Sequence, residues 1–164
     1  MMKIFAGIIL LYSPAGVSYA VLSHCNSSEQ ALFSCQLVNS DKIVSLCASS
    51  ELSVETGYLQ YRSGRTGDID TIFPESMENT QSEFFYNHYF RFHYDLTEVT
   101  FRREGNTYVI YDYYNGEEDP LAHETGVSVN GTTMDCDSSV TNNLMLLDNL
   151  LECDKENTNI GNCE

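Results

Sequence analysis

Six cysteines are the residues of this sequence with the clearest chemistry: Cys25, Cys35, Cys47, Cys136, Cys153 and Cys163. The two closest are ten residues apart, and no Cys-x-x-Cys pair occurs. That short spacing is typical of zinc, iron–sulfur and thioredoxin-like redox sites. An even number of widely spaced cysteines is instead typical of an exported protein with disulfide bonds. We therefore expect three disulfide bonds and neither a metal centre nor a redox motif.

Carboxylates are the second chemical group, since Asp and Glu together number 24. They form close sets at Asp68 with Asp70, at Asp135 with Asp137, and along Glu117–Asp119. A glycoside hydrolase needs two carboxylates across a cleft, and such a pair, or His123 with Glu124, would define a small exported hydrolase. Calcium at the acidic loops is left open, although the Asp-x-Asp-x-Asp-Gly spacing is absent. A chain with 24 acidic residues contains such close sets by chance. The sequence therefore favours a solvated acidic surface and predicts no cofactor.

The remaining catalytic motifs are absent. No glycine-rich phosphate loop, Gly-x-Ser-x-Gly elbow or His-Glu-x-x-His sequence occurs. His88 and His93 are five residues apart on one expected strand, so they point to opposite faces and cannot bind one metal ion together. His88 shares the more apolar face, where we expect it to pack in the core.

Length and charge limit the functional classes further. The chain has 164 residues, which fits one domain, and its 42% hydrophobic content excludes a disordered chain. The formal net charge is −16, with only 8 Lys plus Arg. Nucleic-acid binding needs clustered basic residues and is therefore not expected. A strongly acidic surface favours a basic protein as partner, because it speeds the association of oppositely charged molecules.

The N-terminus has the pattern of a secretory signal peptide. Lys3 precedes an apolar run over 4–12, and Ser18-Tyr19-Ala20 provides small residues for cleavage after Ala20. Nine apolar residues are too few for a membrane span, which needs about 20. Leu22-Ser23-His24-Cys25 is similar to a lipobox, but His24 occupies a small-residue position. We expect a mature domain over 21–164, exported to the periplasm or the extracellular space, with a net charge of −17 once Lys3 is lost.

Strands dominate the mature chain, because short β-rich runs lie between turn signals and because 84–94 alternates, with Tyr86, Phe90 and Phe92 on one face. The expected strands are 31–36, 42–48, 57–62, 68–74, 84–94, 97–103, 107–114, 126–130 and 132–136. Gly105-Asn106 and Asn130-Gly131 are two-residue turn signals, and the first would pair Phe101 with Ile110. After Asp137 the apolar period becomes helical, which predicts one amphipathic helix over 139–152. The predicted fold is mainly β: an antiparallel sheet, small barrel or sandwich of about seven or eight strands with that C-terminal helix.

Two segments invite a binding interpretation. Tyr111 and Tyr113 share one face of their expected strand, while Tyr108 and Tyr114 share the other, so they form no single patch. The double-glycine segment 63–67 is expected to be a loop between strands, which a rigid sheet would present. The candidate binding residues there are Tyr61, Arg62, Ser63, Gly64 and Arg65. An ordinary turn whose arginines offset Asp68 and Asp70 is the alternative.

Several motifs carry a family resemblance. They are Leu32-Phe33-Ser34-Cys35, the run 42–49, Gly57-Tyr58-Leu59-Gln60-Tyr61-Arg62, His88-Tyr89-Phe90-Arg91-Phe92 and Asp112-Tyr113-Tyr114. Together they resemble a group of small exported bacterial proteins with no assigned activity. More remotely, the chain is similar to bacterial inhibitors of C-type lysozyme, which are small β-barrels that begin with an aromatic-x-Cys strand, here Phe33-Ser34-Cys35. Their inhibitory Ser-Gly-x-x-Tyr loop would fall at 63–67, with Gly67 in the place of the tyrosine, and their second motif has no counterpart.

The resemblance also implies a disulfide pairing. In those inhibitors the first cysteine bonds to one on a late strand, which corresponds to Cys35–Cys136. Cys153–Cys163 is local and would hold the tail after the expected helix, and Cys25–Cys47 then remains. The resemblance and the acidic charge favour a non-enzymatic exported binding module, with inhibition of a cationic hydrolase such as lysozyme as its specific form. A small hydrolase or a purely structural envelope protein is the alternative.

Overall fold

The computed structural model describes residues 22–157 and 163, so the expected signal peptide at 1–20 lies outside the described residues. Within the described part, no helix is both long and apolar enough to cross a membrane.

Nine strands make up the fold, all in antiparallel pairs, which confirms the mainly β class and corrects the expected strand number. They are β1 Glu29–Leu37, β2 Ile43–Ser49, β3 Leu59–Arg65, β4 Asp68–Phe73, β5 Phe84–Arg91, β6 Tyr94–Arg103, β7 Asn106–Asn115, β8 Ala122–Val129 and β9 Thr132–Asn142. The short 3₁₀ helices η1 Gln81–Glu83 and η2 Leu144–Leu147 complete the structure of the described residues. The strands form one sheet in the order β4-β3-β2-β1-β9-β8-β7-β6-β5.

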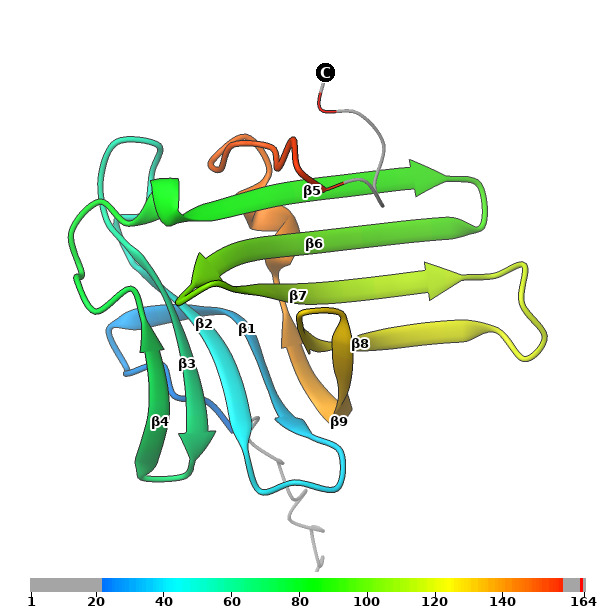
Figure 1. Cartoon of the computed structure of the whole chain (residues 1–164), viewed down its shortest axis with the longest axis horizontal. Helices are drawn as coiled ribbons and strands as arrows, with labels where there is room; N and C mark the ends of the chain where they lie inside the picture. The colour runs from blue at the N-terminus through cyan, green and yellow to red at the C-terminus, as the bar shows by residue number, and fades with distance from the viewer. Residues whose placement is uncertain (1–21, 158–162, 164) are drawn as a thin grey trace, which may run out of the picture.

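The sheet folds over on itself, as Figure 1 shows: β5–β8 run across one side of the steeply inclined β1–β4, and β9 connects the two halves. Aromatic side chains from both halves meet in the core. Phe101 on β6 lies 4.9 Å from Tyr61 on β3 and 5.0 Å from Phe73 on β4, measured between ring centroids. Burial of this apolar face of each half is what holds the two halves together.

The predicted C-terminal helix over 139–152 is wrong. Strand β9 continues to Asn142, and its second half pairs with β1, where Val140 lies opposite Cys35. The apolar spacing that indicated a helix has another cause, since Leu144 and Leu147 are buried on a single 3₁₀ turn, η2. Pairing with β1 satisfies the backbone of residues 140–142 and leaves too few residues for a helix.

Two turns also differ from expectation. The β6–β7 turn uses Glu104 and Gly105, both at positive φ, so Phe101 lies opposite Tyr108 and not Ile110. Asn106 stays in β7, where its side chain accepts a 2.7 Å hydrogen bond from Asn130 of the neighbouring β8–β9 turn. The expected strand 84–94 is interrupted at Phe92 and His93, where the chain turns from β5 into β6. The Asn130-Gly131 turn is confirmed.

Three disulfide bonds are present: Cys25–Cys47, Cys35–Cys136 and Cys153–Cys163, the same pairing as that expected above. Cys25–Cys47 attaches the N-terminal segment to β2. Cys35–Cys136 joins β1 to β9 across 101 residues of chain. Three disulfide bonds are typical of an exported protein.

The far ends of β5–β8 extend beyond the rest of the fold (Figure 1). We call residues 88–98 and 111–125 the distal end. They comprise the second half of the β5–β6 hairpin and the second half of the β7–β8 hairpin with its connecting loop. This projecting part is the most prominent feature of the molecule's shape.

Candidate functional site

The predicted binding segment 61–65 is not a loop but the second half of β3. Tyr61 and Arg62 are buried, Ser63 is half-buried, and only Arg65 is exposed, where it forms an ion pair with Asp41 at 2.7 Å. Gly64 is buried where the backbones of β3 and β4 approach closely, since a Cβ there would lie 2.3 Å from the carbonyl oxygen of Asp68. The glycine thus serves strand packing, and contact of this segment with a partner stays a prediction that rests on Arg65 alone.

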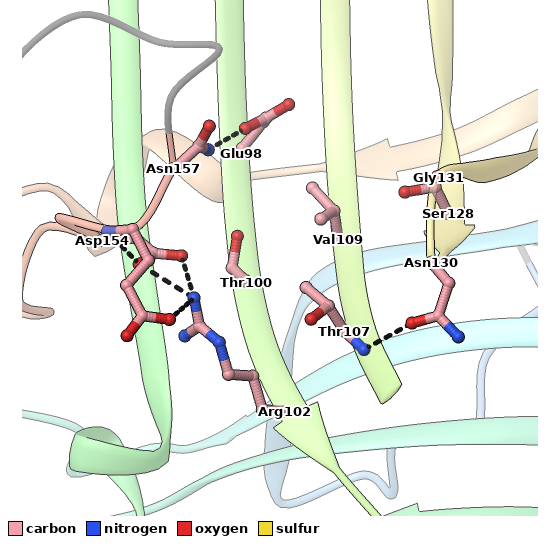
Figure 2. Close-up of a pocket in the computed structure, with 11 residues that line it drawn as sticks. Glu98, Thr100, Arg102, Thr107, Val109, Ser128, Asn130, Gly131, Asp154 and Asn157 are labelled. Atoms are coloured by element: carbon pink, nitrogen blue, oxygen red, sulfur yellow. Dashed lines mark hydrogen bonds and ion pairs between the residues drawn. The ribbon is translucent and has the colours of Figure 1, made fainter. Parts of the chain in front are cut away.

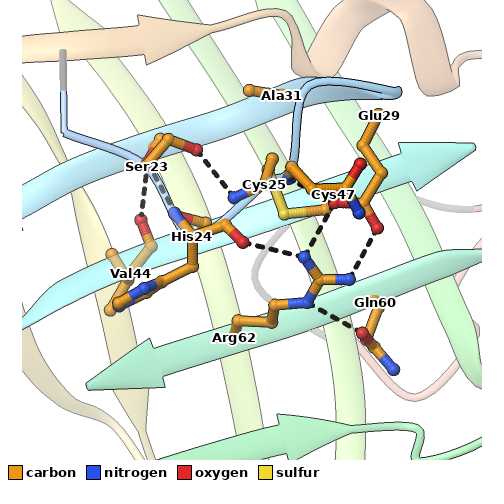
Figure 3. The surroundings of a disulfide bond; sticks show 12 residues. Ser23, His24, Cys25, Glu29, Ala31, Val44, Cys47, Gln60 and Arg62 are labelled. Carbon is orange, nitrogen blue, oxygen red and sulfur yellow. Dashed lines mark hydrogen bonds and ion pairs between the residues drawn. A yellow bond between two sulfur atoms is a disulfide. The ribbon is translucent and has the colours of Figure 1, made fainter. Parts of the chain in front are cut away.

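Arg62 organises a buried polar cluster beneath the N-terminal segment (Figure 3). Its Nη1 and Nη2 donate to both carboxylate oxygens of Glu29 at 2.7 and 2.6 Å, its Nε donates to Gln60, and Nη1 also donates to the carbonyl of His24. Burial alone would raise the pKa of Glu29, but the hydrogen bonds from Arg62, Tyr58 and the Asn26 amide outweigh it and lower the pKa below 4.5. The cluster is therefore structural: it fixes residues 22–29 to β3.

Of the candidate catalytic groups, His123, Glu124, Asp135 and Asp137 line one cleft, described below, but His123 and Glu124 lie on opposite faces of β8. His123 bonds to Asp112 at 3.1 Å. His88 is not in the core as expected but exposed, bonded to Asp95 at 2.8 Å, because the apolar face of β5 ends at Tyr86.

Two of the candidate calcium acids, one in each acidic segment, form ion pairs. Asp70 pairs with Lys42 at 2.8 Å, and Glu117 pairs with Arg91 at 2.6 Å. Among the described residues, the only set with metal-ligand spacing is Cys25, Glu29 and Cys47, whose sulfur atoms are joined in a disulfide.

An acidic cleft opens where β8 and β9 separate beyond Gly126. Its volume is about 490 Å³, and its lining includes Asp112, Glu124, Asp135 and Asp137 but no Lys or Arg among the described residues. Tyr111 donates a 2.7 Å hydrogen bond to Asp135 across Gly126, where a Cβ would lie 2.7 Å from the tyrosine hydroxyl. The small glycine thus lets the tyrosine reach the rim of this cleft.

The distal end carries two exposed aromatic side chains. Phe90 is 69% exposed and Phe92 is 80% exposed, although large apolar side chains are ordinarily buried. The distal end is also acidic, since residues 88–98 and 111–125 contain seven Asp or Glu but only one Lys or Arg, Arg91. Apolar anchors within an acidic surface are a combination typical of protein-binding sites.

A second hollow, which we call the outer-face groove, lies on the face of β6–β8 that points away from the core (Figure 2). Its volume is about 420 Å³, and it lies between Asp154 and Asn157 after β9 and the β8–β9 turn at Asn130. Nη2 of Arg102 donates to both carboxylate oxygens of the buried Asp154, at 3.1 and 3.0 Å. Burial raises the pKa of Glu98, despite a hydrogen bond from Asn157 that lowers it.

Thr100 lies at the centre of the outer-face groove and is only 2% exposed. Its Oγ1 is the one buried side-chain nitrogen or oxygen atom in the described part of the chain without a hydrogen-bond partner. A buried hydroxyl without a partner destabilises a fold by about 1–3 kcal/mol.

Substitution Thr100→Val is therefore expected to raise the free energy of unfolding by about 1 kcal/mol, because valine keeps the shape and removes the unsatisfied hydroxyl. Urea denaturation of the oxidised protein measures this difference. A clear loss of stability would show that Oγ1 has a partner in the folded protein.

Comparison of the chain with protein-family models, with curated proteins and with solved structures finds no match. The sites have therefore to be interpreted from their own chemistry. The distal end and the outer-face groove were both missed by sequence reasoning. The alternation of Phe90 and Phe92 with the core residue Tyr86 was visible, but nothing in it showed that the second half of β5 leaves the core.

Proposed function

We propose that this protein is a non-enzymatic exported binding module whose distal end docks on a cationic protein. The observation that carries the proposal is the exposure of Phe90 and Phe92 on the projecting distal end, which is rich in acidic residues. Exposed apolar side chains of this size supply the desolvated anchors of an interface, and the carboxylates around them select a partner of opposite charge.

The charge of the protein supports a basic partner, because its own Lys and Arg side chains are nearly all paired with its own carboxylates. Six of the seven Lys and Arg in the described residues lie within ion-pair distance of a carboxylate. The unpaired Asp and Glu side chains therefore set the charge of the surface. The distal end contains seven Asp or Glu and one arginine, Arg91, which itself binds Glu117. The field of these acidic residues steers cationic proteins toward the projecting end.

The distal end is also held in shape before any partner arrives. Tyr94 lies between Tyr89 and Tyr113, with ring centroids 5.6 and 5.5 Å away in edge-to-face contacts. Arg91 stacks over Tyr94 and binds both carboxylate oxygens of Glu117, so it connects the two hairpins. A preorganised surface loses less conformational entropy on binding.

Inhibition of a cationic hydrolase is the specific form of this function, and a C-type lysozyme is the first partner to test. The resemblance of the Phe33-Ser34-Cys35 strand and of the Cys35–Cys136 bridge to lysozyme inhibitors supports this choice. The inhibitory loop of those proteins corresponds to the segment over 63–67, so this protein would use the distal end in its place.

Double substitution Phe90→Ser/Phe92→Ser is expected to weaken partner binding at least about tenfold, which corresponds to about 1.4 kcal/mol. Calorimetric titration of the mature protein into a panel of basic proteins that includes a C-type lysozyme measures the affinity. Raising the salt concentration should weaken the wild-type complex as well, because salt screens the acidic surface.

The matched control is Val54→Ser/Met77→Ser, which also replaces two exposed apolar side chains but in the β2–β3 and β4–β5 connections, outside the distal end. It should bind like the wild type. Failure of every basic protein in the panel to bind at low salt would overturn the proposal. Equal loss in the control and the distal-end variant would overturn the assignment of the surface.

A further inference from the structure

We propose that the outer-face groove binds a neutral saccharide chain along β6 and β7. This site is separate from the partner contact at Phe90 and Phe92. Its centre, Thr100, lies outside the distal end, on the half of β6 whose opposite face is packed in the core, and only its far end at Leu96, Tyr111 and Tyr113 reaches into the distal end.

The buried hydroxyl of Thr100 points to a ligand. Folded proteins satisfy nearly all buried polar atoms, and those that remain unsatisfied commonly lie at sites with a role beyond stability. Thr100 is flanked across the strands by Val109 on β7, and Ser128 follows on β8, so two hydroxyls border one apolar side chain on the floor of the groove. A ligand hydroxyl at this position would supply the partner that Thr100 lacks.

The composition of the walls favours a neutral polyol over an anion. Asp154 and Glu156 are both within ion-pair distance of Arg102, at 3.0 Å, so one of their two negative charges is offset and, together with Glu98, the lining stays acidic. Nη2 of Arg102 donates to Asp154, and the guanidinium group stacks over the ring of Phe85. The carboxylates at this end would repel an anion. A saccharide hydroxyl both donates and accepts, and it therefore matches neighbouring arginine, carboxylate and hydroxyl groups.

The groove continues toward aromatic side chains. An adjoining hollow shares Glu98, Val109 and Ser128 with the outer-face groove. It extends to Tyr111 and Tyr113. From Arg102 to Leu96 the floor follows six residue steps of β6, which is about 20 Å at the rise of a strand. A hydroxyl-lined end followed by tyrosine rings offers hydrogen bonds to the edges of sugar rings and apolar surface to their faces.

An extended peptide fits this surface less well. Peptides that add to a sheet bind an unpaired strand edge through their backbone. In the groove, β6 is paired with both β5 and β7, and β7 with both β6 and β8. Only side chains are available here, so recognition has to be of a ligand whose own polar groups point outward along its length.

The test uses the oxidised mature protein and ¹⁵N-labelled amides observed by NMR. The probes are soluble trisaccharides at millimolar concentration: cellotriose, maltotriose and tri-N-acetylchitotriose. We expect at least one to shift the amide signals of Thr100, Val109 and Ser128. Thr100→Val should weaken that binding at least tenfold, because it removes the hydroxyl while it keeps the shape of the side chain.

Thr97→Val is the matched control, since Thr97 lies on the same strand but on the opposite face, where its hydroxyl contacts the sulfur of Met145. It should leave saccharide binding unchanged. Three results would overturn the proposal: no shift with any trisaccharide, binding by Thr100→Val equal to that of the wild type, or shifts at the same amides with a tri-lysine peptide and with none of the sugars. The Phe90→Ser/Phe92→Ser variant should bind saccharide normally, so failure of the proposed function would leave this result unaffected.

Discussion

Replacement of both Cys35 and Cys136 by alanine is expected to lower the free energy of unfolding by about 4–5 kcal/mol. The bond joins residues 101 positions apart, and in the chain-entropy model a loop of this length is worth about 4.7 kcal/mol. Cys35 is also fully buried between the two halves of the sheet. Since small domains are stable by only about 5–15 kcal/mol, the variant should lose much of its stability. Guanidinium denaturation at equilibrium measures the change.

The internal comparison for this prediction is Cys153→Ala/Cys163→Ala. That bond closes a loop of ten residues, which the same model values at about 2.7 kcal/mol. Its removal should therefore cost less, and it should leave the core intact. Equal or greater destabilisation by the Cys153→Ala/Cys163→Ala variant would contradict the argument from loop length.

Substitution Arg62→Met is expected to destabilise the protein by about 3–5 kcal/mol, because it leaves the carboxylate of Glu29 buried without its partner. The side chain of Glu29 is completely covered and that of Arg62 is 9% exposed. The double variant Glu29→Gln/Arg62→Met should be more stable than Arg62→Met alone, since it carries no buried unpaired charge. Additive losses in the two single variants would show that the pair does not interact.

The same pair predicts how stability depends on pH. Hydrogen bonds hold the pKa of Glu29 below its ordinary value of 4.5 in the folded protein. The folded state therefore releases this proton more readily than the unfolded chain, and the stabilisation is fully present above pH 4.5. It is lost as pH falls from there through the lower folded pKa. Denaturation midpoints at several pH values should show a shallower acid dependence for Glu29→Gln than for the wild type.

Local sequence determined most of the strands. Short β-rich runs between turn signals identified β1, β2, β6 and β7 to within a few residues, because strand composition and turn residues are local properties. The Asn130-Gly131 turn was equally readable, since few residues accept the positive φ angles of a tight hairpin. The wide spacing of the cysteines also predicted disulfide bonds before any fold was known.

Tertiary structure decided the rest, because it depends on which segments meet. The residues after Asp137 have a helical apolar period, yet pairing of β9 with β1 draws them into the sheet. Arg62 beside two glycines suggested an exposed loop, but Glu29, 33 positions earlier, buries it in an ion pair. Phe90 is exposed because the core packed against β5 ends at Tyr86. The hydroxyl of Thr100 lacks a hydrogen-bond partner because of the side chains that surround it in the folded protein. Burial and pairing are sums over contacts between distant parts of the chain, whereas alternation and turn residues are local, and only local properties can be read from the order of the amino acids.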